Sequence, residues 1–366
     1  MADKGSKIVN AREIQLMYRW MSQAAITIEN PYIPNSTAEG KFVEGTIEFK
    51  QRSLEIQHLW DSDEKYRRYL NSLCEIEVFI CEVLANKNPD SPLIENDMRL
   101  LEKYFDKVRE FAERYKSNYI LSQHVQLFFD CWIALDLGLK GFHNRRDVSY
   151  KVWMHQHEVF NNLLDLIRIK EQSPQFKQKL ALRKDKSSKR YRGAKSYVGR
   201  LFDNHSVLEV IRIDLSFRND LAISMAAEGA KEYFQKFKNN LRGKPSLFDD
   251  MVGHIWKLGW APEKGFYFHL ILLFVDSDTF NSENVARQIG EYWIQKICNG
   301  NGVFMNSNVS EHSDRNLGTG KIKADESEKM KILVSVAERM AKMDQYLQPT
   351  PLGEGKLFGH GALNNT

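Results

Sequence analysis

The residues of this chain best suited to chemistry are Lys and Arg side chains gathered between Arg168 and Arg200. This stretch holds twelve cationic side chains against Glu171 and Asp185, a formal charge of +10, while the remaining chain sums to −6. Clustered Lys and Arg bind nucleic-acid phosphates and release condensed counterions. A solvated linker is the alternative. The cations that we expect to contact DNA are Arg183, Lys184, Lys186, Lys189, Arg190, Arg192, Lys195 and Arg200.

Motifs for nucleotide hydrolysis and for paired-cysteine chemistry are absent from the sequence. The nearest approach to a phosphate loop, Gly318-Thr319-Gly320-Lys321, lacks the spacing of the first glycine and the following hydroxyl. The four cysteines form no Cys-x-x-Cys pair, which excludes a zinc ribbon or a thioredoxin-like dithiol. Cys74 and Cys81 lie seven apart on one face of an expected helix, a pattern typical of small buried hydrophobic residues.

Two regions of different periodicity must position these residues. From 48 to 170, apolar residues recur at three and four positions, which predicts a helical N-terminal domain of four or five helices over 1–170. We expect a basic linker over 171–200, an α+β domain over 201–348 and a flexible tail over 349–366, where Pro, Gly and Asn are frequent.

The expected C-terminal domain has the order β-α-β-β-α-β-α. Its strands are predicted at 207–217, 252–260, 265–275 and 302–306, and its helices at 222–241, 282–297 and 326–347. Residues 261–264 have the composition of a hairpin turn. This pattern predicts one small antiparallel sheet.

No segment of the sequence is apolar over the length of a bilayer. The longest apolar run, Phe266 to Val275, is ten residues long and is interrupted by His269. The charged N-terminus makes a secretory signal unfavourable, so we expect a cytoplasmic protein with no membrane contact.

Several sequence segments resemble one family in their order and spacing. They are Val210 to Phe217, Gly265 to Phe274, Ile289 to Trp293, Gly318 to Gly320 and Lys342 to Leu347. Together they resemble the inovirus-type replication-initiator family, whose C-terminal domain carries the prophage names YagK/YfjJ. The resemblance covers roughly 190–347.

This resemblance implies a rolling-circle-initiator fold with metal-dependent DNA nicking. In such a fold, histidines on the central strand hold a divalent metal, Mg²⁺ or Mn²⁺, which polarises the phosphate. A tyrosine on a later helix attacks the phosphodiester and becomes covalently joined to the nicked strand.

The chain departs from that family pattern at two positions. Where the family has His-x-His on the hairpin strand, this chain has Tyr267-Phe268-His269, and the position of the expected nucleophile is Arg339. His269 could be a metal ligand or a hydrogen-bonded core histidine. Tyr346, one turn after Lys342, could be a displaced nucleophile or could pack the end of its helix.

The leading hypothesis is therefore a DNA-binding protein of a phage, prophage or mobile element with a degenerate nicking centre. Single-stranded or hairpin DNA would be the partner, no cofactor would be required, and Arg339 and Lys342 would add phosphate contacts. One alternative is an active nicking and strand-joining enzyme that uses His269 and Tyr346. Another is a protein-interaction module whose N-terminal helices bind a host or phage protein. The sequence does not indicate the oligomeric state of the protein.

Overall fold

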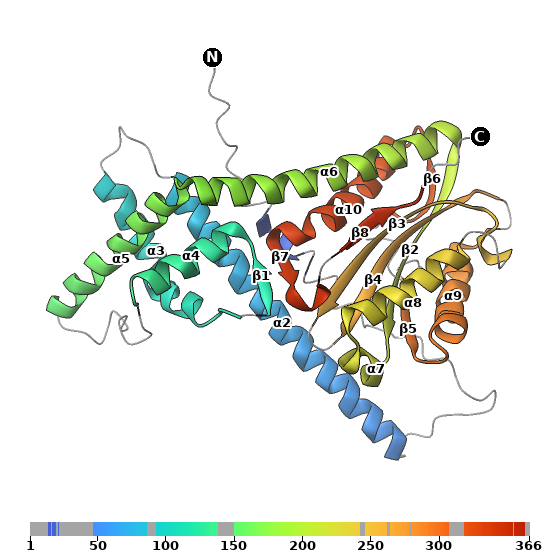
Figure 1. Ribbon diagram of the computed structural model, residues 1–366, viewed down its shortest axis with the longest axis horizontal. Helices are drawn as coiled ribbons and strands as arrows, with labels where there is room; N and C mark the ends of the chain where they lie inside the picture. Colours follow the sequence, from blue (N-terminus) through green and yellow to red (C-terminus); the bar gives the residue numbers. More distant parts are fainter. Residues whose placement is uncertain are drawn as a thin grey trace. The chain divides into compact units, whose positions relative to one another are not determined.

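Most of the chain forms two compact units in the computed structural model (Figure 1). The first unit contains 66–185 and 345–348, and the second contains 186–344 and 349–366. The residues that the structure describes are 14–15, 17–19, 21, 47–85, 93–116, 118–137, 150–241, 246–261, 264–277, 280–306, 318–353 and 355–362.

The first unit is built on helices, as its periodicity predicts. They are α2 (Ile47–Ala85, of which the part from Tyr66 belongs to this unit), α3 (Leu93–Ala112), α4 (Gln123–Ala134) and α5 (Tyr150–Glu171). Phe79 of α2 lies in the aromatic core, with its ring centroid 4.8 Å from that of Tyr104 and 6.1 Å from that of Phe128. A short strand, β1 (Tyr119–Leu121), pairs with β7 (Leu347–Pro349).

The second unit is built on a six-stranded sheet in which the pairings are antiparallel. Its order is β5-β2-β4-β3-β8, and β6 also pairs with β2. The strands are β2 (Val207–Phe217), β3 (Met251–Ala261), β4 (Gly265–Val275), β5 (Gly302–Asn306), β6 (Gly320–Lys323) and β8 (Phe358–His360). The hairpin of β3 and β4 and the strand β5 confirm the sequence-based expectation.

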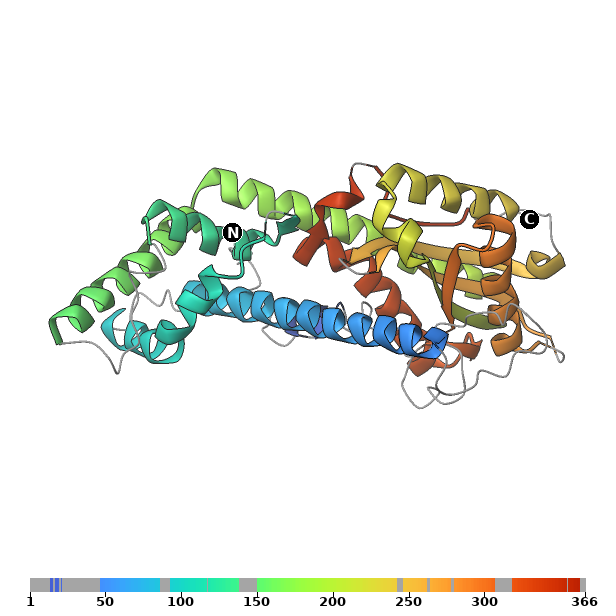
Figure 2. The same cartoon turned by 90° about the horizontal axis from the view of Figure 1, so that it is seen from below.

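Helices lie against both faces of this sheet, so β4 is buried along nearly its whole length. On one face, α8 (Ala227–Asn240), α9 (Ser282–Tyr292) and the π-helical segment Trp293–Ile297 cover an apolar core that includes Phe266 and Phe268. The parts of α6 (Pro174–Asn204) and α10 (Ser327–Tyr346) that belong to the second unit lie on the opposite face, as Figure 1 shows. Figure 2 shows α8, in yellow, and α10, in red, on opposite sides of the strands.

Nearly all of the segment predicted as a linker, 171–200, lies in the helix α6, and the chain passes from the first unit to the second within it, between 185 and 186. The density of charge in this segment hides its helical periodicity. Ala194, Tyr197, Val198 and Leu201 recur at three and four positions and are all buried. The Tyr197 hydroxyl accepts a hydrogen bond from the His254 amide of β3 at 3.2 Å, which seats this part of α6 on the sheet.

The segment predicted as a flexible tail is docked on the sheet over 349–362, where every residue except 354 is described. Strand β8 pairs with the edge strand β3, and the amide of Leu258 donates to the carbonyl of Leu357 at 2.9 Å. Leu352, Leu357 and Phe358 are buried. An edge strand offers unpaired backbone groups, and a short apolar segment that satisfies them becomes ordered despite its Gly and Pro content.

Smaller differences affect the helices. The helix expected over 222–241 is two helices, α7 (Asn219–Ser224) and α8, and the helix expected over 282–297 ends in the π-helical segment. The short strands β6 and β8 were not expected. The α+β class, with N-terminal helices followed by an antiparallel-sheet domain, is confirmed. No helix among the described residues is long and apolar enough to span a bilayer.

The docking of the C-terminal segment can be tested at two neighbouring residues. Leu357→Ala removes a side chain that is 2% exposed and belongs to the core, so it should lower the free energy of unfolding by about 2 to 4 kcal/mol. Lys356→Ala, at an exposed position, should change it by less than about 0.5 kcal/mol. Denaturant unfolding of both variants makes the comparison, and equal stabilities would contradict the docked strand.

Candidate nucleic-acid interface and buried polar centre

The outer face of α6 in the second unit presents a run of exposed cations. No acidic residue occurs from 186 to 202. Because the buried residues of this helix lie on its opposite side, the cations fall on the solvent side, three residues apart over most of the run. We call this the basic face of α6, and its exposed side chains are Lys186, Lys189, Arg192, Lys195 and Arg200.

Two of the cations predicted to contact DNA instead line the interior of the first unit. Arg183 is half-buried and donates to the backbone carbonyl of Leu121 in β1. Lys184 is also half-buried, and both side chains line a small hollow in this unit. Their charge is therefore directed into the protein.

Three more of the predicted cations have partners within the second unit. Arg190 donates to Asp344 at 2.6 Å. Lys342 pairs with Glu338, one turn away on α10, at 2.5 Å, and Arg339 lies 3.4 Å from the Ser335 hydroxyl. All three cations are half-buried.

A line of polar side chains crosses the sheet on the face that α6 and α10 cover. His269 of β4 is paired in register with Asp214 of β2 and with Lys257 of β3. His269 Nδ1 lies 2.5 Å from Asp214 Oδ1, and both side chains are buried. The Tyr267 ring stands beside His269, with 4.9 Å between ring centroids. The two positions of the family's His-x-His pattern therefore do share one face, with a tyrosine at the first.

Asp214 is held as a carboxylate by the groups around it. Burial by itself would raise its pKa, but the charge and hydrogen bond of His269, together with Lys264 and Arg212, hold the pKa below its ordinary value. Lys264 Nζ lies 4.0 Å from the second carboxylate oxygen and 4.5 Å from the centroid of the Tyr267 ring. His269 thus lies in a buried, hydrogen-bonded and largely cationic setting.

A second buried carboxylate joins three elements of the second unit. Asp344, near the end of α10, accepts from Lys257 Nζ of β3 at 2.6 Å and from Arg190 of α6 at 2.6 Å. Lys257 is 1% exposed. Burial opposes ionisation of Asp344, yet the two cations outweigh it and lower the pKa of this carboxyl. The arrangement is a buried charge triad.

Tyr346, the candidate displaced nucleophile, belongs to the first unit, whereas His269 belongs to the second. Its side chain is buried, and its ring packs edge-on against Tyr18, with 5.8 Å between centroids. It also lines the hollow with Arg183. These contacts fit the alternative in which Tyr346 packs the end of α10.

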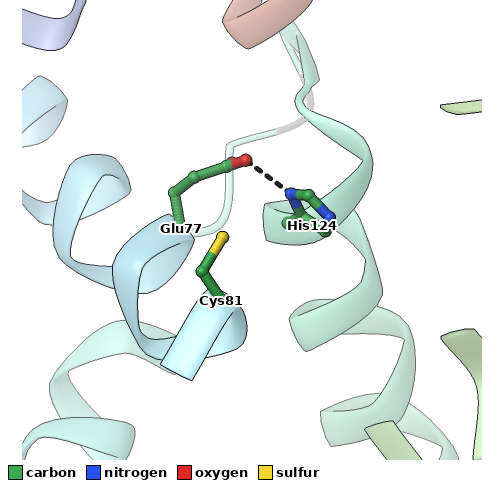
Figure 3. Close-up of side chains that lie close together, drawn as sticks. All are labelled: Glu77, Cys81 and His124. Atoms are coloured by element: carbon green, nitrogen blue, oxygen red, sulfur yellow. Dashed lines mark hydrogen bonds and ion pairs between the residues drawn. The ribbon is translucent and has the colours of Figure 1, made fainter. Parts of the chain in front are cut away.

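A group of side chains that could hold a metal ion lies in the first unit and does not include His269. One ligand atom each from Glu77, Cys81 and His124 lies within 4.8 Å of the others. Figure 3 shows Glu77 and Cys81 projecting from α2 toward His124 on α4. Burial, followed by the charge of Glu77, raises the pKa of the Cys81 thiol to about 12, so this thiol is protonated in the metal-free protein.

Sequence reasoning missed this group for a simple reason. The four-residue spacing of Glu77 and Cys81 on an expected helix was visible, but we interpreted Cys81 as a buried hydrophobic residue. His124 follows 43 residues later with no pattern that joins it to the other two. Only the packing of α4 against α2 brings the three together.

Comparison with known proteins identifies the C-terminal region. The model of a family described as YagK/YfjJ C-terminal domain matches residues 170–360, just over half of the chain. No curated protein and no solved structure matches.

The charge triad leads to a stability prediction. Asp344→Asn leaves Lys257 buried without its counter-charge, so the free energy of unfolding should fall by about 3 to 5 kcal/mol. The control is Glu338→Gln, which breaks a pair whose side chains are 32% and 33% exposed and should cost less than about 1 kcal/mol. Denaturant titrations of both variants test this, and equal costs would contradict the triad.

The same triad predicts a pH dependence. Because the pKa of Asp344 is lower in the folded protein than its ordinary value of 3.8, the carboxylate contributes its stability fully above about pH 4. That contribution is lost as the pH falls through the folded pKa. The stability gap between the wild type and Asp344→Asn should therefore be constant near neutrality and shrink in acid. A gap that widened below pH 4 would contradict this assignment.

Proposed function

The chain belongs to the family of the YagK/YfjJ C-terminal domain, and on that premise we propose that it is a DNA-binding protein of a phage, prophage or related mobile element. The observation that carries the proposal is the basic face of α6, where five exposed cations stand without an acidic residue among them. This helix lies within the part of the chain that the family comprises. Binding of DNA phosphates to such a cluster of cations is favourable because it releases condensed counterions.

The geometry favours contact with the DNA backbone over reading of its bases. Lys and Arg side chains spread along one helix face bind phosphates in any sequence. Single-stranded or hairpin DNA is the substrate that we infer, in keeping with the motif order that resembles inovirus-type replication initiators. Tyr191 is half-buried, with Lys342 Nζ 5.5 Å from its ring centroid, and could stack on a base at the edge of the basic face.

Binding can be measured on labelled single-stranded, hairpin and duplex DNA at two salt concentrations. If all five cations contact phosphates of single-stranded DNA, the affinity should fall roughly 100-fold between 50 and 200 mM salt, from a slope of about 0.7 per contact. Lys186→Ala with Lys189→Ala should lower the affinity at least several-fold and reduce the slope by about 1.4.

A matched control is Lys236→Ala with Lys296→Ala, which removes the same charge from exposed positions on the opposite face of the sheet. This variant should bind like the wild type. An absence of salt-sensitive binding on every DNA, or equal losses in the two double variants, would overturn the proposal.

A nicking and strand-joining activity stays a prediction that the same material can test. Wild-type protein is incubated with Mg²⁺ or Mn²⁺ and supercoiled or single-stranded DNA. A nick with protein covalently joined to DNA, lost in Tyr346→Phe, would replace the binding proposal with the enzymatic one. The binding proposal needs neither the metal nor Tyr346.

A further inference from the structure

The first unit contains three metal-ligating side chains of three different types at one place. Glu77 and Cys81 are buried, and the His124 side chain is 12% exposed. Their ligand atoms lie within 4.8 Å of one another. In a tetrahedral site with bonds of about 2.0 to 2.3 Å, ligand atoms stand about 3.3 to 3.8 Å apart, so small side-chain rotations would complete the coordination.

The backbone that carries these ligands is held by the core. Glu77 and Cys81 are one helical turn apart on α2, and Phe79 and Ile80, between them, are fully buried. His124 is in the first turn of α4, whose start is fixed by the hydroxyl of Ser122 accepting from the Val125 amide at 3.0 Å. Two packed helices thus present the ligands from opposite sides.

The ligand types select the kind of ion. Thiolate and imidazole are ligands that Zn²⁺ prefers, whereas Mg²⁺ requires an octahedral set of oxygens. One thiolate and one carboxylate carry two negative charges, which would neutralise a divalent ion in this buried position. A neutral complex avoids the cost of an uncompensated charge in the interior.

Neighbouring groups supply the remaining features of such a site. The Ser122 hydroxyl donates to Glu77 Oε2 and orients the carboxylate, while Glu77 Oε1 lies 2.7 Å from His124 Nδ1. Glu77 and His124 also line the small hollow, together with Ser122 and Gln345.

We propose that Glu77, Cys81 and His124 bind one Zn²⁺ ion or a similar transition-metal ion. The site would tie α2 to α4 and so stabilise the helical unit. The alternative arrangement is the metal-free one, in which His124 and Ser122 serve only as hydrogen-bond partners of a buried carboxylate. The two arrangements differ in whether the Cys81 sulfur coordinates an ion.

Substitution of Co²⁺ into the full chain tests directly whether the Cys81 sulfur coordinates the ion. Protein stripped with a chelator is titrated with Co²⁺ and then with Zn²⁺, and its absorption spectrum is recorded. One equivalent of Co²⁺ should produce a sulfur-to-cobalt charge-transfer band and the visible bands of tetrahedral cobalt, and Zn²⁺ should remove both. Mg²⁺ should not compete.

Two matched cysteine variants show which thiol gives rise to the charge-transfer band. Cys81→Ser should abolish it and lower the Zn²⁺ affinity by about 100-fold or more, since loss of outer-shell partners alone costs about 10- to 100-fold. Cys74→Ser, on the same helix outside the group, should retain the band. Circular dichroism checks that both variants are folded. A wild type without the band, or an unchanged band in Cys81→Ser, would overturn the proposal.

Discussion

Asp344 accepts hydrogen bonds from two cations that lie 87 and 154 residues away in sequence. Lys257 comes from the sheet, Arg190 from α6, and Asp344 itself from α10, so one carboxylate joins three elements of the second unit. A buried lysine is costly without a counter-charge. The packing of α6 and α10 on the sheet therefore depends on this contact being complete, and the position of the basic face follows from it.

The two faces of the sheet differ because of what covers them. Beneath α8 and α9 the alternating residues of β4 are large and apolar, whereas the intervening positions include Tyr267 and His269. Asp214 and Lys257 continue this polar line on the neighbouring strands. Buried polar groups of this kind are tolerated when they are paired, and their pairing specifies one register of the strands. A residue such as His269 can thus be explained by structure without assigning it a reaction.

The basic segment has two roles that its composition does not separate. Within α6, Arg183 and Arg190 point inward and hold backbone or carboxylate groups, while the basic face points to solvent. The cations on the inner side contact other groups of the protein, and those on the outer side form the basic face to which we assign the DNA contact. The proposed DNA contact therefore involves fewer cations than the twelve Lys and Arg residues between Arg168 and Arg200.

The sequence by itself determined the α+β class, the hairpin of β3 and β4, the strands β2 and β5, and the resemblance to the matched family. These features are local, since alternation, turn residues and motif order are all read along the chain. The helical structure of the segment predicted as a linker and the docking of the segment predicted as a tail were not foreseen, because charge and Gly or Pro content describe a segment without showing what it packs against. Tertiary structure alone decided three further features. They are which cations of α6 face solvent, how Asp214 holds His269, and how His124 approaches Glu77 and Cys81. Each of these features depends on contacts between residues far apart in sequence, and such contacts cannot be predicted from the local spacing of residues.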